Sequence, residues 1–282
     1  MNRGRRWSLR SRSLSLQRPL IMGVLNLTPN SFSDGGLFPN ADAALDHAFG
    51  LVEDGADLID VGGESTRPGA AAVTASEEME RVLPAVEVLA GAGLVVSVDT
   101  SKPEVAAAAL EAGAEVINDV TAGSDPEMLP LVARTGAGVI LMHMQGDPRT
   151  MQVDPQYEDV VGEVTSFLAG RAEAAQARGI DPGKLALDPG IGFGKNLHHN
   201  LALLRHLQLF RSLGFPLVLG VSRKSFLGKI TGVDNPVDRD LASSVTAALA
   251  VERGADIFRV HNVASCREAV AVALAIVRES GG

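Results

Sequence analysis

The sequence predicts an α/β protein that folds as a single (β/α)8 barrel, the TIM barrel. From residue 20 onward, eight short apolar runs alternate with Ala-rich amphipathic stretches, which matches the number of units in this barrel. Glycine marks the ends of helical stretches in repeated phrases such as EDGAD and ERGAD, each just before the next apolar run. A doubly wound open sheet is the rival architecture, but its usual G-x-G-x-x-G turn does not follow the first strand.

The expected elements follow from the alternating patterns. Strands are expected at residues 20–25, 58–61, 94–98, 116–118, 138–142, 185–187, 216–221 and 257–260. Helices are expected at residues 41–53, 76–89, 103–111, 126–134, 157–178, 200–211, 238–253 and 264–278. No linker, low-complexity tract or second hydrophobic pattern interrupts this series, so residues 20–282 are expected to form one catalytic domain.

The first 19 residues form a basic segment with two interpretations. Six arginines lie among residues 1–18, together with several serines and no acidic residue, a composition compatible with an organellar transit peptide. However, Trp7, Leu9, Leu14 and Leu16 alternate with polar residues, which is a strand pattern. A short antiparallel hairpin that caps the bottom of the barrel is therefore the preferred prediction.

The composition excludes several classes of protein. The chain of 282 residues carries 25 Lys plus Arg against 34 Asp plus Glu, a net charge of −9, so a global basic footprint for nucleic acid is absent. No apolar run reaches the length of a membrane span without polar interruption. The one cysteine, Cys266, rules out an internal disulfide and indicates a reducing, cytoplasmic compartment.

The stretch LIMGVLNLTPNSFSDGG at residues 20–36 shows how this chain presents polar groups. An unbroken apolar run, typical of a strand buried on both faces, changes abruptly into a polar loop that ends on Gly35-Gly36. Taken alone, this loop is equally compatible with an ordinary polar connection and with an active-site loop. The same change recurs after all eight predicted strands, at the face where the active sites of such barrels lie. The recurrence predicts an enzyme.

Four polar residues near the ends of strands three, four, six and seven would converge on one cavity: Asp99, Asn118, Asp188 and Lys224. One interpretation is a structural ion pair between Asp188 and Lys224. The other is a slot for a flat, nitrogen-rich heterocycle, because a carboxylate accepts two parallel N–H bonds and a lysine donates to a ring oxygen or nitrogen. Arg67, Arg259 and His261 would add a local positive cluster suited to phosphate, although each alone is compatible with a solvated surface charge.

Eight motifs in this order resemble the dihydropteroate synthase family. They are NLTPNSFSDGG (26–36), DVGGESTRPGA (60–70), VDTSKPEVA (98–106), INDVTAG (117–123), MHMQGDPRTMQ (142–152), DPGIGFGK (188–195), SRKSFLG (222–228) and RVHNV (259–263). The resemblance covers residues 20–273. It implies a homodimeric barrel that joins 6-hydroxymethyl-7,8-dihydropterin diphosphate to 4-aminobenzoate and releases diphosphate, with Mg²⁺ as cofactor.

The resemblance also implies a role for each site residue. The pterin would be held by Asp99, Asn118, Asp188 and Lys224, with Met142 and Gly220 beside them. The diphosphate would meet Arg67, Arg259 and His261, and Asn26 would bind the metal. The aminobenzoate pocket would comprise Thr66, Arg67, Pro68, Phe193, Ser222 and Lys224. The catalytic set would be Asp34, Asp99, Lys224 and Arg67, with Asp34 stabilising positive charge on the pterin.

The residues fit a dissociative displacement, in which the diphosphate departs before the amine attacks. No residue of the set resembles an activated nucleophile, since Cys266 lies downstream of the polar face with no paired base evident. Leaving-group neutralisation and stabilisation of a pterin cation would suffice. Two alternatives remain. The first is a pterin-binding methyltransferase barrel that acts with a corrinoid protein, which should lack the combination of SFSDGG, STRPG and SRKS. The second is a non-catalytic pterin-binding barrel, which should lack the positive cluster of Arg67, Arg259 and His261.

Overall fold

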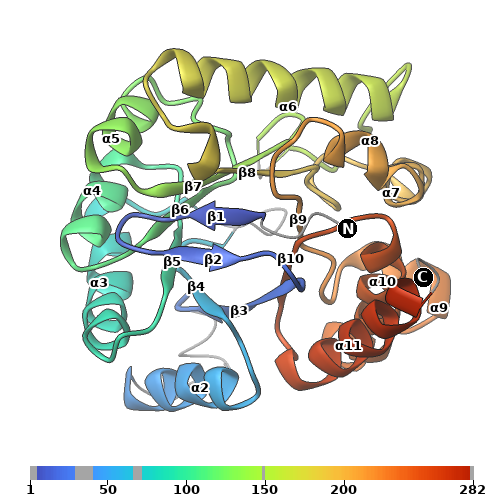
Figure 1. The fold of residues 1–282 in the computed structure, drawn as a ribbon, viewed down its shortest axis with the longest axis horizontal. Helices are drawn as coiled ribbons and strands as arrows, with labels where there is room; N and C mark the ends of the chain where they lie inside the picture. Colours follow the sequence, from blue (N-terminus) through green and yellow to red (C-terminus); the bar gives the residue numbers. More distant parts are fainter. Residues whose placement is uncertain (1–4, 29–40, 66–71, 148–149, 280–282) are drawn as a thin grey trace.

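The computed structural model describes residues 5–28, 41–65, 72–147 and 150–279 (Figure 1). Its centre is a sheet of eight parallel strands in the order β8-β7-β6-β5-β4-β3-β10-β9. A parallel bridge between Leu187 and Leu217 joins β8 to β9 and closes the sheet into a barrel. The strands are β3 (Leu20–Asn26), β4 (Leu58–Gly62), β5 (Val96–Asp99), β6 (Val116–Asp119), β7 (Gly138–Met142), β8 (Leu185–Asp188), β9 (Val218–Leu219) and β10 (Ile257–Val260). The predicted (β/α)8 barrel is confirmed.

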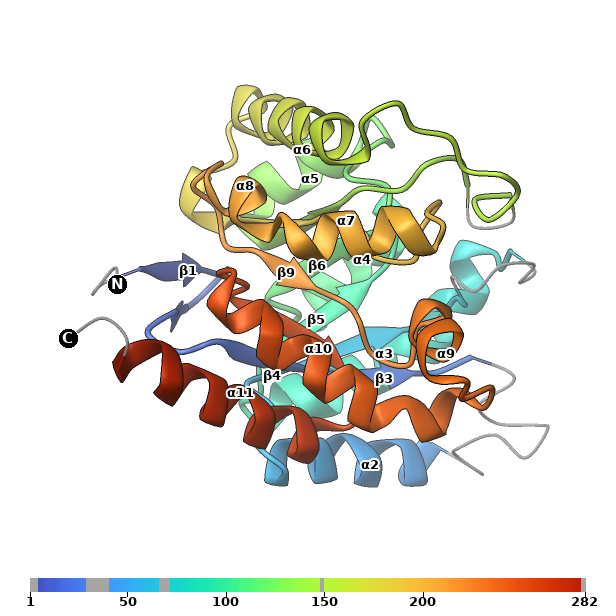
Figure 2. The same cartoon turned by 90° about the vertical axis from the view of Figure 1, so that its right-hand side faces the viewer.

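Helices surround the barrel, as Figures 1 and 2 show from its end and from its side. The α-helices are α2 (Ala41–Glu53), α3 (Ala75–Gly91), α4 (Pro103–Glu111), α5 (Met128–Thr135), α6 (Val160–Ala177), α7 (Leu197–Arg205), α8 (Leu207–Arg211), α9 (Ser225–Thr231), α10 (Asp240–Glu252) and α11 (Val263–Glu279). Two 3₁₀ turns, η1 (Pro182–Lys184) and η2 (Pro236–Arg239), precede β8 and α10. As predicted, Gly136 caps α5 in the left-handed conformation (φ 68°). Gly113 and Gly254 also have positive φ but lie one residue beyond the C-caps of α4 and α10, Ala112 and Arg253.

Three elements differ from the prediction. The helix expected at 200–211 is two helices, because His206 adopts a non-helical conformation (φ −109°, ψ 27°) between α7 and α8. Of the strand expected at 216–221, Val218 and Leu219 pair with β10, and Leu217 makes a single bridge to Leu187. The seven-residue helix α9 was not predicted; it is short, and Gly228 interrupts its apolar pattern.

The N-terminal hairpin is confirmed. Strands β1 (Arg6–Ser8) and β2 (Ser13–Ser15) pair antiparallel, with Trp7 opposite Leu14. Trp7 is fully buried, packs with the apolar residues at the lower end of the barrel and donates from Nε1 to the carbonyl of Lys184 at 3.1 Å. Figure 1 shows the hairpin lying across this end of the barrel.

The arginines of this segment hold the hairpin to the barrel. Three of them form ion pairs with acidic residues at the amino ends of strands: Arg5 with Asp256, Arg12 with Glu115 and Arg18 with Asp57.

None of the helices in the described ranges is long and apolar enough to span a membrane.

Strand register decides which residues face the barrel interior. Asn26 pairs with Gly62, Gly62 with Asp99, and Asp99 with Asn118. Because side chains alternate along a strand, neighbouring residues in register point to the same face of the sheet. The rest of the interior is filled by apolar side chains, among them Met22, Leu58, Val116, Ile140, Ala186, Val218 and Ile257.

Candidate active site

The polar residues at the carboxyl ends of the strands meet at one end of the barrel. Gly62 leaves open the space between two of them, because a Cβ atom there would lie 3.6 Å from Asn26 Oδ1 and 3.6 Å from Asp99 Cβ. On the opposite side, Met142 is in register with Asp188, and a Cβ atom on Gly220 would lie 3.9 Å from Asp188 Oδ2. The strands therefore bring five predicted site residues to one rim.

A guanidinium shared by two carboxylates forms the floor of this site. Arg259 donates from Nε to Asp60 Oδ2 at 2.6 Å and from Nη2 to Asp99 Oδ2 at 2.8 Å. Asn118 also donates to Asp60 Oδ2, at 3.1 Å from its Nδ2. Because the amide nitrogen is engaged by a carboxylate, the amide oxygen of Asn118 is the atom left to accept a hydrogen bond.

Burial brings the pKa values of the central groups toward neutrality. Burial raises the pKa of Asp99 to about 7, against the lowering effect of Arg259, and the neighbouring Asp60 raises it further. Burial also raises the pKa of Asp188 to about 6, although Gly190 donates its N–H to Oδ1 at 2.7 Å. Burial lowers the pKa of Lys224 to about 8, with Arg259 acting in the same direction. Small changes in surroundings therefore shift charge in this site.

The alternative of a structural Asp188–Lys224 ion pair is not what the structure shows. Among the described residues, no ion pair within 4.0 Å joins Asp188 to Lys224. The Lys224 ammonium instead lies over the ring of Phe193, 4.0 Å from its centroid. Both charged groups thus keep hydrogen-bonding capacity for a ligand.

Ser222 and His261 make two hydrogen bonds with each other. The backbone N–H of His261 donates to Ser222 Oγ at 3.1 Å, and the same oxygen lies 2.9 Å from Nδ1 of the ring. In the described part of the chain, Nδ1 is the acceptor within reach of the serine hydroxyl. With the serine hydroxyl as the donor, the neutral ring carries its proton on Nε2; the reverse roles would place the proton on Nδ1. Burial, then the positive charges of Arg223 and Arg259, lower the pKa of His261 to about 3, so the ring is a neutral N–H donor.

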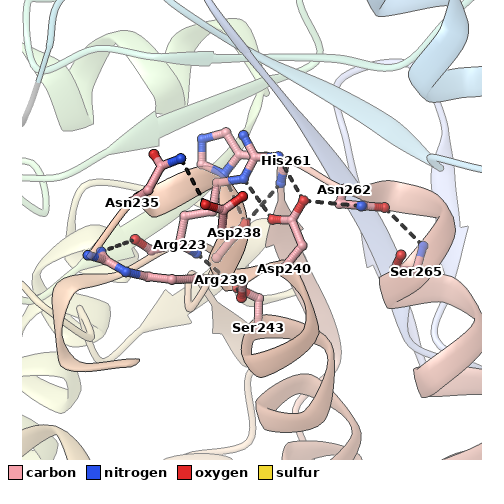
Figure 3. A network of polar contacts seen from close by, with 10 residues as sticks. Arg223, Asn235, Asp238, Arg239, Asp240, Ser243, His261, Asn262 and Ser265 are labelled. Atoms are coloured by element: carbon pink, nitrogen blue, oxygen red, sulfur yellow. Dashed lines mark hydrogen bonds and ion pairs between the residues drawn. The ribbon is translucent and has the colours of Figure 1, made fainter. Parts of the chain in front are cut away.

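Arg223 stands between the site residues Ser222 and Lys224 in a left-handed conformation, with φ 58°. Figure 3 shows its guanidinium paired with both carboxylate oxygens of Asp240, at 2.7 and 2.8 Å. Asp240 also accepts from Asn262 at 3.1 Å. A non-glycine residue persists in this conformation only where its surroundings fix it. The network therefore joins the loop after β9 to the loop after β10.

The comparisons with known proteins agree with this geometry. The family described as "Pterin binding enzyme" matches residues 22–261. The chain belongs to this family. Dihydropteroate synthase from Neisseria meningitidis serogroup B is 49% identical over 273 residues, covering 94% of this chain and 95% of the relative. The Escherichia coli dihydropteroate synthase is 48% identical over 261 residues, with 92% of each chain covered.

Solved structures of pterin-binding enzymes superpose closely on the chain. Yersinia pestis dihydropteroate synthase with a sulfonamide drug complex gives a TM-score of 0.92 at 46% identity, covering 96% of this chain and 98% of that one. The Xanthomonas albilineans enzyme with 4-aminobenzoic acid gives 0.91 at 47% identity, with the same coverage. The Xanthomonas albilineans enzyme in complex with 7,8-dihydropteroate gives 0.87 at 44% identity, again with the same coverage.

Some predicted site residues lie outside the described ranges, namely Asp34, Thr66, Arg67 and Pro68. Sequence reasoning missed other residues that build the site. Asp60 was taken as part of an apolar strand, yet its carboxylate is fully buried and binds Arg259. A lone acidic residue in an otherwise apolar strand was the signal available. Arg223 and Asp240 gave no comparable signal, because their pairing depends on how α10 packs.

Proposed function

We propose that the chain is a dihydropteroate synthase, a transferase that joins 6-hydroxymethyl-7,8-dihydropterin diphosphate to 4-aminobenzoate and releases diphosphate. The convergence of Asp99, Asn118, Asp188 and Lys224 at one rim of a pterin-binding barrel carries this proposal. Relatives at 44–47% identity have structures with 4-aminobenzoic acid and with 7,8-dihydropteroate, which supports the same substrate and product here.

The pterin slot complements the donors of a 2-amino-pyrimidinone edge. The Asp188 carboxylate accepts two parallel N–H bonds, and the free amide oxygen of Asn118 accepts a third. Lys224 donates to a ring oxygen or nitrogen, while its contact with the Phe193 ring places an aromatic wall beside the pterin. Met142 and Gly220 leave room for the flat ring.

His261 would donate to the diphosphate from Nε2, the ring nitrogen that does not contact Ser222. Arg259 contributes less free positive charge than the sequence suggested, because Asp60 and Asp99 share its guanidinium. Arg67 would supply the remaining charge. Thr66, Arg67 and Pro68 would line the aminobenzoate side with Phe193 and Ser222.

A magnesium ion fits the donors present as a partner of the diphosphate. Within the described ranges, no cluster of three or more His, Cys, Asp or Glu side chains offers a protein cage. Asn26 and Asp99 face each other across Gly62, and a few oxygen ligands suffice for Mg²⁺, which keeps waters and substrate phosphates in its shell. Asn26 would bind it, and the ion would neutralise charge on the leaving diphosphate.

The displacement is dissociative and needs no covalent intermediate. Burial raises the pKa of the Cys266 thiol to about 12, which excludes it as a nucleophile. The carboxylates of Asp99 and Asp34 would stabilise positive charge on the pterin as the diphosphate departs. The amine of 4-aminobenzoate then attacks the exposed methylene carbon.

The experiment that separates the two candidate reactions offers the protein both sets of reactants. A synthase consumes 4-aminobenzoate and the pterin diphosphate. The methyltransferase alternative instead moves a methyl group from a methylated tetrahydropterin to a reduced cobalamin. Methyl transfer without condensation would replace the proposal by that alternative.

We infer that the second copy of a homodimer covers an apolar face on α10 and α11. Leu241, Val245 and Leu249 recur every four residues along α10 and are 77%, 50% and 55% exposed. Val272 and Ile276 on α11 are 61% and 63% exposed, and α11 lies beside α10 in Figure 2. An exposed apolar patch of this kind marks an interaction surface.

Light scattering tests this interface. Leu241→Glu should give a monomer at concentrations where the native chain is a dimer. Val88→Glu, at an exposed apolar residue of α3, is the control and should leave the mass unchanged. A dimer that survives Leu241→Glu places the interface elsewhere.

We also infer a cytoplasmic location, since the one cysteine of the chain, Cys266, is free and buried.

A further inference from the structure

Lys195 closes the loop after β8, and its ammonium is buried with neutral partners. The residue is 2% exposed. Its Nζ lies 2.9 Å from His143 Nδ1, 2.8 Å from the carbonyl oxygen of Phe193 and 3.4 Å from that of His143. In its ammonium form, three N–H donors thus meet three acceptors. Among the described ion pairs none includes Lys195, so its Nζ contacts neutral acceptors alone. Burial lowers the pKa of Lys195 to about 7, and the ammonium form predominates below that pH.

The loop after β8 lies directly on the loop after β7. Gly190 and Gly194 have φ of 66° and 62°. A Cβ atom on Gly190 would lie 1.8 Å from the carbonyl oxygen of His143, and one on Gly194 would lie 2.6 Å from that of Gln145. Only glycine permits such contact between two backbones. Lys195 bonds across this contact, from the end of one loop to the start of the other.

The same loop carries two groups of the substrate site. Asp188 begins it, and Phe193 lies two residues before Lys195. The carbonyl of Phe193 accepts from the Lys195 ammonium, while its ring lies under Lys224. The carbonyl of Asp188 accepts from the backbone N–H of His143 at 3.0 Å. Displacing Lys195 would therefore loosen the loop 188–195, and with it both the ring of Phe193 and the backbone next to the Asp188 carboxylate.

We propose that Lys195 is a positioning residue for the reaction, which fixes the loop 188–195 and through it Phe193 and Asp188. The assignment of substrates to these groups rests on the proposed function. The lysine touches no substrate itself. Because Lys195 bonds to His143, that histidine has the same positioning role. Burial, and then the positive charge of Lys195, lower the pKa of His143 to about 3, which keeps its ring neutral.

The charge of Lys195 has a second effect, on Asp188. Three cations face this carboxylate, namely Lys224, Lys195 and Arg259, and each lowers a pKa that burial raises. Removing the charge of Lys195 should raise the pKa of Asp188 above its value of about 6. A pterin that requires the ionised carboxylate would then bind only at higher pH.

A matched pair of lysines tests the proposal. Lys184 also donates to backbone carbonyls, those of Leu9 and Gly136, but it does so at the hairpin end of the barrel. Lys195→Met should raise the KM for 4-aminobenzoate by roughly tenfold or more, because small misplacements of a site wall are costly. It should also move the acid limb of pterin binding to higher pH. Lys184→Met should do neither, although it should lower the melting temperature.

Hydrogen exchange makes the test independent of the reaction. In Lys195→Met without ligands, the amides of residues 190–194 should exchange faster than in the native chain and in Lys184→Met. Unchanged exchange, unchanged KM and an unchanged acid limb in folded Lys195→Met would overturn the proposal. If the native chain makes no dihydropteroate but the loop loosens as stated, the proposed function fails while the positioning role stands.

Milder variants at His143 keep the test decisive if Lys195→Met does not fold. His143→Leu removes the acceptor at Nδ1 and should raise the KM for 4-aminobenzoate in the same direction. His143→Asn places an amide oxygen near that position and should restore most of the native KM. Equal KM values for these two variants would contradict a role for the Lys195–His143 bond.

Discussion

Arg259 donates from Nε to the carboxylate of Asp60 at 2.6 Å, and this ion pair forms the floor of the site. Asp60 is completely buried, and among the described residues its second oxygen, Oδ1, has no hydrogen-bond partner. Removing one partner of a buried pair leaves an uncompensated charge. Both partners also act on Asp99, the other carboxylate that Arg259 contacts: burial raises the pKa of Asp99, Arg259 lowers it and Asp60 raises it.

Asp60→Asn should move the acid limb of kcat/KM for the pterin diphosphate to lower pH. The charge of Asp60 raises the pKa of Asp99, which is about 7, and Arg259 lowers it. With asparagine at position 60, the raising effect of the Asp60 charge on the pKa of Asp99 is lost, and the lowering effect of Arg259 remains. The pKa of Asp99 should therefore fall, which favours its ionised form. The measurement is a pH–rate profile, with Asp256→Asn as the control for a buried carboxylate at the far end of the barrel. An acid limb that stays in place or rises would contradict this coupling.

Asp188→Asn should weaken pterin binding roughly ten- to a hundredfold, because a hydrogen bond to a charged group contributes about 1.5–3 kcal/mol. The amide keeps the shape of the carboxylate but cannot accept both ring N–H groups. Calorimetric titration with a pterin measures the effect. Native affinity in this variant would show that Asp188 has a structural role only.

The same substitution should change how stability depends on pH. The folded-state pKa of Asp188, about 6, lies above the usual 3.8, so the folded chain binds this proton more tightly than the unfolded chain. The resulting stability is present below pH 4 and lost as pH rises through 6. The stability of Asp188→Asn does not fall in this way as pH rises. Between pH 4 and pH 7, its free energy of unfolding should therefore increase by on the order of 3 kcal/mol relative to that of the native chain. A stability difference that is constant across denaturant titrations in that range would refute it.

Ser222→Ala should free the ring of His261 to change tautomer. Loss of the hydroxyl removes the bond to Nδ1. Diphosphate affinity should fall roughly fivefold, about the value of one neutral hydrogen bond. Nitrogen NMR of His261 should report mixed tautomers, whereas Ser243→Ala, which alters the neighbouring network around Arg223, should leave the Nε2–H form. An unchanged tautomer in Ser222→Ala would rule out this role for the serine.

The sequence was most informative where each strand carries its own signal. An apolar run followed by Asp99, Asn118 or Asp188 predicts both the strand and the direction of the polar group, because the carboxyl ends of parallel strands share one face. The alternation of Trp7, Leu9, Leu14 and Leu16 likewise predicted the hairpin.

The remaining features depend on contacts between distant segments. The bond from Arg259 to Asp60 joins residues 199 positions apart and requires the inward register of two strands. The left-handed conformation of Arg223 requires Asp240 on α10. The assignments of Asp34, Thr66, Arg67 and Pro68 stay predictions, since these residues lie outside the described ranges.

Asp34→Ala should lower kcat by roughly a hundredfold, as expected for an electrostatic group acting on the transition state. Affinity for the pterin diphosphate should change little, because the positive charge develops only as the diphosphate departs. Asp34→Asn separates this role from that of a turn residue before Gly35, since Asn keeps the turn hydrogen bonds. Near-native kcat in Asp34→Asn would favour the turn role.

The most direct test of the proposed reaction is a condensation assay with the purified chain, Mg²⁺, 6-hydroxymethyl-7,8-dihydropterin diphosphate and 4-aminobenzoate. Mass spectrometry should detect 7,8-dihydropteroate, and a coupled assay should detect diphosphate in equal amount. Omitting 4-aminobenzoate should abolish dihydropteroate formation. Folded protein that forms neither product with both substrates present would contradict the assignment.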